Sequence, residues 1–134
     1  QEVQLEAALH RLYERQAALP SKDHKMLIAP TSVMRVKEYI GDNLTSQLTL
    51  DDLARLSGYS RFHFARGFKT ATGLPPYVYI LRARVALACR LLEEKQLPVQ
   101  AVASASGFAS HPQFASRFRQ LTGISPSAYR KVMR

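Results

Sequence analysis

Apolar residues recur every three or four positions along most of the chain, and no segment alternates apolar and polar residues as a strand does. This spacing predicts helices at residues 32–44, 50–57, 60–72, 76–94, 99–106, 110–122 and 127–132. The core faces expected for the first and the longest of these helices are Val33, Val36, Tyr39, Ile40 and Leu44, and Leu81, Val85, Ala88, Leu91 and Leu92. We therefore expect an all-α fold of about seven helices.

A further helix is predicted at residues 1–19, because Leu5, Leu9, Leu12, Gln16 and Leu19 form a short heptad seam with one polar position. Two interpretations stay open: this helix packs back on an upstream domain, or it pairs with a second copy in a dimer. Residues 20–30 have a Pro at each end and are expected to form a linker, with the globular part beginning near Thr31. Because the chain starts with Gln rather than Met, residues 1–30 are expected to be the tail of an upstream domain that has been cut away.

One pattern occurs twice in the rest of the chain. Its first copy comprises Ala54, Gly58-Tyr59, Phe64, Phe68, Thr72-Gly73, Pro76 and Tyr79. Its second copy comprises Ala103, Gly107-Phe108, Phe114, Phe118, Thr122-Gly123, Pro126 and Tyr129, displaced by 49 residues before the turn and by 50 after it. Each copy reads as a short helix, a glycine turn and a second helix. The pattern predicts a duplicated helix-turn-helix, at about residues 50–73 and 99–123, a motif that mainly serves to place its second helix in a DNA groove.

The residue types suit such a unit. Ala54 and Ala103 are small where the second helix crosses close over the first. Gly58 and Gly107 stand where a tight turn favours positive φ, which a Cβ would make costly. The phenylalanines four residues apart are expected to anchor each second helix in the core and not to touch DNA.

The net charge of +9 is concentrated in one part of the chain. Residues 1–30 hold four basic and four acidic residues, whereas residues 31–134 hold fifteen basic and six acidic ones. No acidic residue follows Glu94, and the basic residues beyond it are Lys95, Arg117, Arg119, Arg130, Lys131 and Arg134. Uncompensated positive charge is typical of a protein that binds a polyanion, and the helix-turn-helix pattern disfavours a merely soluble basic surface.

Other chemistry finds little support in the sequence. The single cysteine, Cys89, excludes an internal disulfide, fits a reducing cytoplasm and is interpreted as a small buried side chain rather than a redox thiol. No second His or Cys lies at metal-ligand spacing beside His63, which is expected to be solvated or to cap a helix. No signal peptide or membrane span is visible. We therefore expect no enzyme, no metal and no cofactor.

The outer face of the helix at residues 60–72 carries the first set of candidate DNA contacts. Arg66 is expected to donate to guanine, and Phe62 either to contact a thymine methyl or to fold back onto the protein surface. Ser60 is expected to cap the helix and offer its first-turn amides to a phosphate. Arg61 and Lys69 are expected to contact phosphates.

The helix at residues 110–122 carries the second set. Its candidates for base contacts are Gln113, whose amide suits adenine, and Ser116. Its candidates for phosphate contacts are Ser110, His111, Arg117 and Arg119.

These residues resemble the DNA-binding domain of the AraC/XylS family of bacterial transcription regulators, over about residues 31–134. The most specific part of the resemblance is Gly107-Phe108, Phe114, Phe118, Gly123-Ile124-Ser125-Pro126 and Tyr129-Arg130. In the first half, the matching residues are Pro76, Tyr79, Arg84, Ala88 and Leu91-Leu92. The resemblance implies two three-helix subdomains joined by the long helix at residues 76–94, which place their second helices in successive major-groove segments. One chain would then read an asymmetric site of about two turns of double-stranded DNA.

The resemblance also implies partners and regulation. It predicts a sequence-specific regulator, expected to be an activator, with RNA polymerase as a candidate partner and a homodimer formed through the N-terminal helix or an upstream domain. The remaining alternative is a helical protein-interaction module whose basic charge is incidental, although two units are few for a solenoid.

Two positions depart from the family pattern. Ser116 stands where the first copy has Arg66, with arginine displaced to Arg117. The second recognition helix is therefore expected to position the protein on DNA more than to specify a sequence. Pro75 replaces the usual Ser before the long helix, which removes a side-chain cap but fixes the turn.

Overall fold

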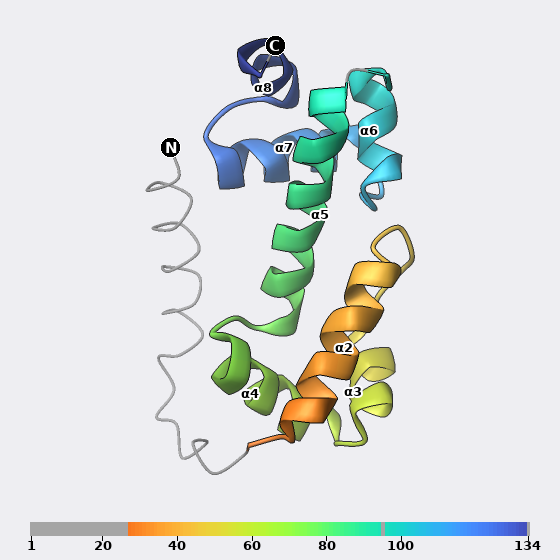
Figure 1. The fold of residues 1–134 in the computed structure, drawn as a ribbon, viewed down its shortest axis with the longest axis vertical. Coiled ribbons are helices and arrows are strands. Elements are labelled where there is room, and N and C mark those ends of the chain that lie inside the picture. The colour runs from red at the N-terminus through yellow and green to blue at the C-terminus, as the bar shows by residue number, and fades with distance from the viewer. Residues whose placement is uncertain (1–26, 95, 134) are drawn as a thin grey trace. The chain divides into compact units, whose positions relative to one another are not determined.

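The computed structural model describes residues 27–94 and 96–133. These residues form seven α-helices and no strand: α2 (Pro30–Asp42), α3 (Leu50–Ser57), α4 (Arg61–Thr72), α5 (Pro76–Glu94), α6 (Val99–Ala105), α7 (His111–Thr122) and α8 (Pro126–Val132) (Figure 1). The all-α prediction is confirmed. The helix predicted at residues 1–19, with its heptad seam, lies outside the described residues. So does the part of the predicted linker, residues 20–30, that precedes Leu27.

The described residues divide into two compact units, one up to Ile80 and the other from Leu81 onward. The boundary falls inside α5. The first turn of α5 therefore belongs to the N-terminal unit with α2, α3 and α4, and the rest of α5 belongs to the C-terminal unit with α6, α7 and α8.

Helix ends are set by side-chain caps and glycines, largely as predicted. Four helices begin where a hydroxyl oxygen accepts a backbone N–H three residues on, at 3.1–3.2 Å: Thr49, Ser60, Ser110 and Ser125. Gly58 and Gly107 take the expected positive φ, at 83° and 98°. Gly73 ends α4 at a φ of 81°, and Gly123 ends α7 at 88°.

The bounds of α2 differ from the prediction. The helix begins and ends two residues earlier than residues 32–44, because Pro30 occupies its first turn, where a missing N–H costs nothing. Ser32 is buried inside the helix, and its hydroxyl donates to the carbonyl oxygen of Ser57 at 3.2 Å. Ile28, which precedes the helix, is also buried.

Two predicted core faces need small corrections. Tyr39 was expected in the core of the first helix but is 39% exposed, whereas Leu44 is buried although it lies beyond the end of α2. On α5, the expected Val85, Ala88 and Leu92 are buried. Leu81 and Leu91 are half-buried.

Matched aromatic cores hold α4 and α7 in place. Phe64 and Phe68 are fully buried, with ring centroids 5.5 Å apart, and Phe68 meets the ring of Tyr79 edge-on at 5.3 Å. The second copy repeats this arrangement: Phe118 lies 5.6 Å from Phe114 and 5.6 Å from Tyr129. The predicted anchoring role of the paired phenylalanines is therefore confirmed.

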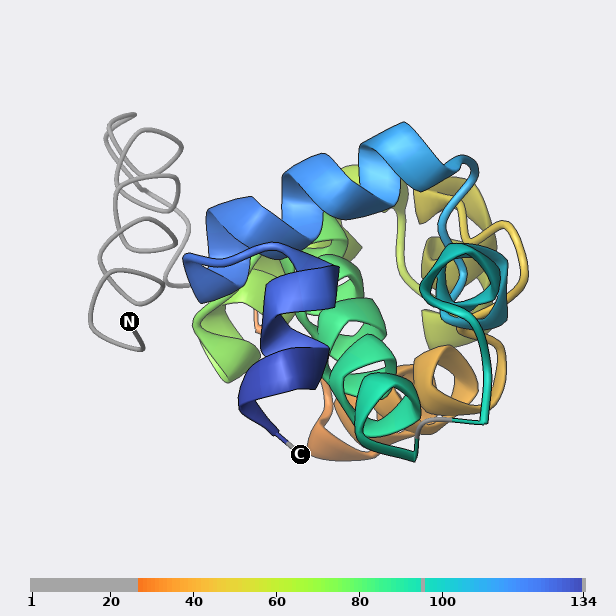
Figure 2. The same ribbon diagram turned by 90° about the horizontal axis from the view of Figure 1, so that it is seen from above.

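In the C-terminal unit, α8 closes the end of α5, beside which it lies in Figure 2. The last carbonyl groups of a helix have no partner within the helix. Arg130 donates from Nε to the carbonyl oxygen of Leu92 at 3.0 Å, and the hydroxyl of Tyr129 donates to Oε2 of Glu93 at 2.7 Å. Burial, together with the bond to Glu93, raises the pKa of Tyr129, so the hydroxyl keeps the proton that this bond needs.

Candidate nucleic-acid interface

The first recognition helix, α4, packs its inner face in the core and exposes its outer face, which carries the candidate DNA contacts. Ala54 of α3 is buried where α4 packs against α3, and the two phenylalanines of α4 fill the core below. The hydroxyl of Ser60 caps α4, as predicted, by accepting the N–H of His63. On the outer face, Arg61 is exposed, and Lys69 is half-buried.

The two base-contact candidates of α4 lie against each other. The ring of Phe62 is 57% exposed. The guanidinium carbon of Arg66 lies 5.0 Å from the centre of this ring, one helical turn along. A guanidinium over an aromatic face is attracted by the ring and loses rotational freedom. Phe62 thus helps to fix the direction in which Arg66 presents its donors.

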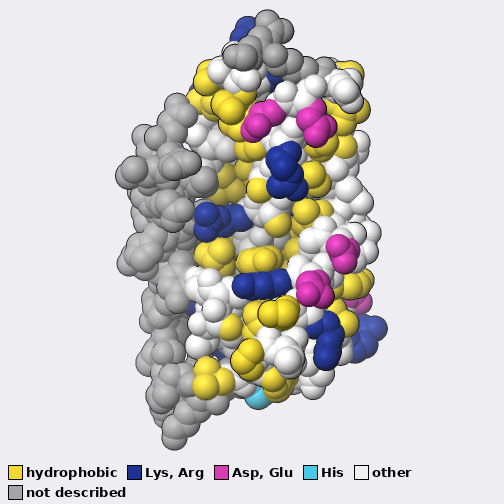
Figure 3. Space-filling view, in the orientation of Figure 1, with side chains coloured by type: hydrophobic (Ala, Val, Ile, Leu, Met, Phe, Trp, Pro, Cys, Tyr) yellow, Lys and Arg dark blue, Asp and Glu magenta, His cyan; other side chains and the backbone are white. Residues whose placement is uncertain are grey.

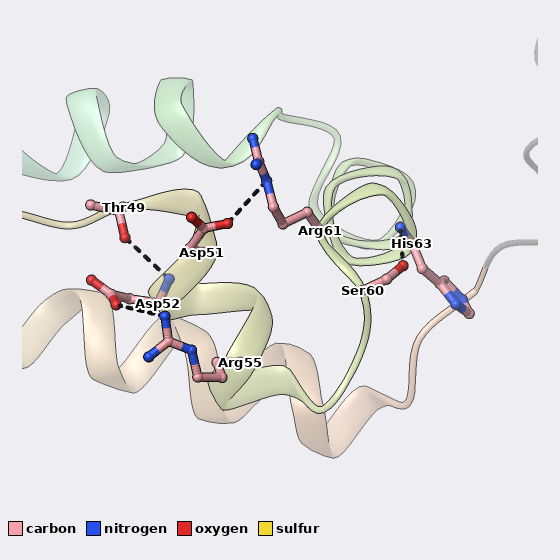
Figure 4. A network of polar contacts seen from close by, with 7 residues as sticks. All are labelled: Thr49, Asp51, Asp52, Arg55, Ser60, Arg61 and His63. Atoms are coloured by element: carbon pink, nitrogen blue, oxygen red, sulfur yellow. Dashed lines mark hydrogen bonds and ion pairs between the residues drawn. The ribbon is translucent and has the colours of Figure 1, made fainter.

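A second contact of α4 was not anticipated from the sequence. Nε of Arg61 lies 3.0 Å from Oδ1 of Asp51 in the first turn of α3, and both side chains are largely exposed (Figure 4). Asp52 pairs instead with Arg55 of its own helix, at 3.7 Å. The spacing of Asp51 and Arg61 along the chain gives no helical signal, because the pair forms only when α3 and α4 cross.

His63 was expected to be solvated or to cap a helix, but it is half-buried and makes a tertiary contact instead of a cap. Its Nε2 lies 3.0 Å from the carbonyl oxygen of Leu27, and its ring centroid is 4.7 Å from that of Tyr59. The hydroxyl of Tyr59 in turn accepts the backbone N–H of Ala29 at 3.0 Å. These two bonds tie the segment before α2 to the start of the recognition helix, across a sequence separation that no local pattern reveals.

The second recognition helix, α7, presents its candidates in the open. All six are exposed: Ser110, His111, Gln113, Ser116, Arg117 and Arg119. The hydroxyl of Ser110 caps the helix by accepting the N–H of Gln113 at 3.2 Å. Arg117 donates to the side-chain oxygen of Gln120 at 3.2 Å.

The outer faces of the two recognition helices are not equivalent. The positions of Phe62 and Arg66 on α4 are occupied by Pro112 and Ser116 on α7. The aromatic–guanidinium pair of the first copy therefore has no counterpart at these positions in the second. Pro112 lies in the first turn of α7, where its missing N–H is tolerated.

The face of the described residues that Figure 3 draws is mixed in character. On this face, basic side chains are interspersed with acidic and apolar ones, which is typical of an ordinary solvated surface. Within residues 27–94 and 96–133, no helix combines the length and apolar character that a membrane crossing needs. Among the same residues, no three His, Cys, Asp or Glu side chains gather where they could hold a metal ion.

Cys89 is half-buried rather than buried as expected. Burial raises the pKa of its thiol and outweighs the opposing hydrogen bond with Tyr129. The thiol lines an apolar hollow with Val85, Leu121 and Ile124. A thiol in such surroundings is seldom ionised near neutral pH, so Cys89 lacks the environment of a reactive cysteine.

Comparison with known proteins agrees with this geometry. Residues 53–132 match a family described as "Helix-turn-helix domain". The chain is 40% identical over 98 residues to the HTH-type transcriptional activator AarP of Providencia stuartii, covering 73% of each protein. It spans only 42%, 31% and 46% of the length of three other curated relatives.

Solved structures agree as well. The DNA-binding domain of the global transcriptional factor AdpA, in complex with a target DNA, is 34% identical with a TM-score of 0.73, covering 76% of this chain and 92% of that one. An AraC-type regulator from Chromobacterium violaceum is 29% identical with a TM-score of 0.72, covering 77% of this chain and 92% of that one. Two capped helix-turn-helix units, the matched family and these relatives lead to one conclusion: the chain belongs to the AraC/XylS family of DNA-binding transcription regulators.

Proposed function

We propose that this chain binds double-stranded DNA sequence-specifically by inserting α4 and α7 into successive major-groove segments. The observation that carries the proposal is the stack of Arg66 on the exposed ring of Phe62, on a helix whose opposite face is fixed in the core. An arginine held in this way can donate two hydrogen bonds to guanine O6 and N7. Phe62 is then placed to contact a neighbouring thymine methyl.

The other candidates on α4 and α7 divide into two roles. Gln113 and Ser116 are proposed to meet base edges in the second groove segment. The proposed phosphate contacts are Ser60, Arg61, Lys69, Ser110, His111, Arg117 and Arg119. Because Ser116 stands where α4 has Arg66, α7 is proposed mainly to fix the register of the protein on DNA.

We extend the proposal to the setting of the domain. The DNA-binding part comprises residues 31–134 together with the short segment from Leu27 that packs against the first helix-turn-helix, and the residues before it are proposed to be an N-terminal helix and linker. We propose that the protein works in the cytoplasm, where its DNA lies, as an activator that contacts RNA polymerase, and that it forms a homodimer. We assign Cys89 no catalytic role, since burial raises the pKa of its thiol and makes the reactive thiolate scarce.

The test is selection of the protein against a random duplex library, followed by binding of the winning sequence at increasing salt. We expect a motif of about two helical turns and a steep fall of log affinity with log salt. A motif of one half-site would mean that α7 only positions the protein. Salt-insensitive binding, or none, would overturn the proposal and favour a protein-interaction module.

A further inference from the structure

One ion pair joins the two helices of the first helix-turn-helix. Asp51, in the first turn of α3, holds Nε of Arg61, the first residue of α4, at 3.0 Å. In Figure 4 the end of the guanidinium group extends beyond the carboxylate, on the side away from α3. The contact therefore uses the Nε donor of Arg61, and the arginine side chain stays 67% exposed.

The pair adds little to the stability of the unit. The side chains of Arg61 and Asp51 are 67% and 57% exposed, and ion pairs in such surroundings contribute little because water screens them. Each helix is capped independently, α3 by Thr49 and α4 by Ser60. What the pair does determine is where the charge of Arg61 lies.

The second copy has no equivalent pair. Gln100 stands at the position of Asp51, and His111 at that of Arg61. The first turn of α6 carries no acidic residue at all. The duplication therefore supplies an internal contrast: the copy with the arginine–phenylalanine stack also carries a carboxylate beside a phosphate-contact candidate.

We propose that Asp51 is a positioning residue that restrains Arg61 and so suppresses non-specific DNA binding. This inference rests on the proposed function. A restrained guanidinium can reach a phosphate from fewer docked positions of α4 than an unrestrained one can. An unrestrained arginine follows the phosphate backbone from any loosely docked position, and phosphate contacts are the source of sequence-independent affinity. Asp51 thus raises the ratio of specific to non-specific binding.

The experiment compares Asp51→Asn with Asp52→Asn in the whole chain. Both variants remove one negative charge from the same helix turn, but Asp52 pairs with Arg55 and leaves Arg61 held. Affinity for the selected duplex and for a scrambled duplex is measured at several salt concentrations, and thermal unfolding checks that each variant is folded.

For Asp51→Asn on scrambled DNA, we expect the log–log salt slope to steepen by up to about 0.9, the value for one more phosphate contact, with an unchanged slope on the selected duplex. Between 200 and 50 mM salt, such a contact strengthens binding to the scrambled duplex by a further factor of up to about 3.5. Asp52→Asn should change the affinity for both duplexes by the same factor, so the ratio of the two affinities stays the same.

A second arm repeats Asp51→Asn in an Arg61→Ala background, where the change in slope should vanish. If Asp51→Asn and Asp52→Asn behave alike, or if the effect persists without Arg61, the positioning role is wrong while DNA binding stands. If the wild-type protein shows no salt-dependent DNA binding, the proposed function itself has failed.

Discussion

At the scale of single residues, phenylalanine has two different roles on α4, one on the buried face and one on the exposed face. Phe68 is fully buried and Phe62 is 57% exposed on the same helix. The sequence predicts this division, because the spacing from Phe64 determines which side each ring faces. It does not reveal the partners of Arg61 and His63, since Asp51 lies on another helix and the backbone of Leu27 lies far away in the sequence.

Arg66→Ala should separate base reading from phosphate binding. Loss of its donors should cost about 1–3 kcal/mol of binding free energy and relax the preference at one base pair. Lys69→Ala, on the same helix, should weaken binding to all DNA sequences by a similar factor. Competition binding against single-base variants of the selected site measures both. An equal loss on every sequence for Arg66→Ala would contradict its assignment as a base contact.

Phe68→Ala should strongly destabilise the protein, whereas Phe62→Ala should leave its stability almost unchanged. Removing the buried ring leaves a cavity and should lower the free energy of unfolding by about 3–5 kcal/mol. Removing the exposed ring should change it by at most about 0.5 kcal/mol but weaken binding to the selected site, because Arg66 loses its support. Urea unfolding measures the first effect and duplex binding the second. A comparable loss of stability in both variants would contradict the two-faced description of α4.

At the scale of elements, most helix bounds could be predicted because their signals are local. Ser60, Ser110 and the glycine turns act within three or four residues, which is the range of capping chemistry. The start of α2 was missed because Pro30 was assigned to the linker, although proline is favoured in the first helical turn. The burial of Ser32 depends on Ser57 of another helix, so local pattern does not show it.

Gly58→Ala tests the turn of the first helix-turn-helix. No atom lies within 4 Å of a Cβ at this position, so the cost comes from the backbone φ of 83° and should be about 1–2 kcal/mol of unfolding free energy. Gly41→Ala is the matched control, because Gly41 also has open space but lies within α2. There alanine should stabilise the protein by about 0.5–1 kcal/mol. Chemical unfolding of both variants measures this opposite sign, and two changes of the same sign would contradict it.

At the scale of the whole molecule, the two copies share a scaffold but not an outer face. The repeated core and turn residues were recognisable in the sequence because packing constrains their spacing. The difference between Arg66 and Ser116 is equally visible in the sequence, and the structure adds that the first copy couples its arginine to the aromatic ring of Phe62. We therefore expect the two copies to differ in how strongly they discriminate between bases.

Ser116→Arg should make the second copy more discriminating. An exposed arginine at this position of α7 can reach a guanine, and we expect about 1–3 kcal/mol of new discrimination in the second half of the selected motif. Ser104→Arg adds the same charge at an exposed position of α6 and should strengthen binding to all DNA sequences by a similar factor. Repeating the library selection with both variants distinguishes them. An unchanged motif for Ser116→Arg would mean that α7 does not approach the bases.

The contacts between α8 and α5 also set an order of events during synthesis. The N-terminal unit has all its helices once Ile80 has been made, whereas the end of α5 waits for Tyr129 and Arg130, which bond to Glu93 and Leu92. Fifty residues separate Ile80 from Arg130. At about 5–20 residues per second, a ribosome needs roughly 3–10 s for that stretch. The residues of the first helix-turn-helix are thus present several seconds before Tyr129 and Arg130, the residues that close the end of α5.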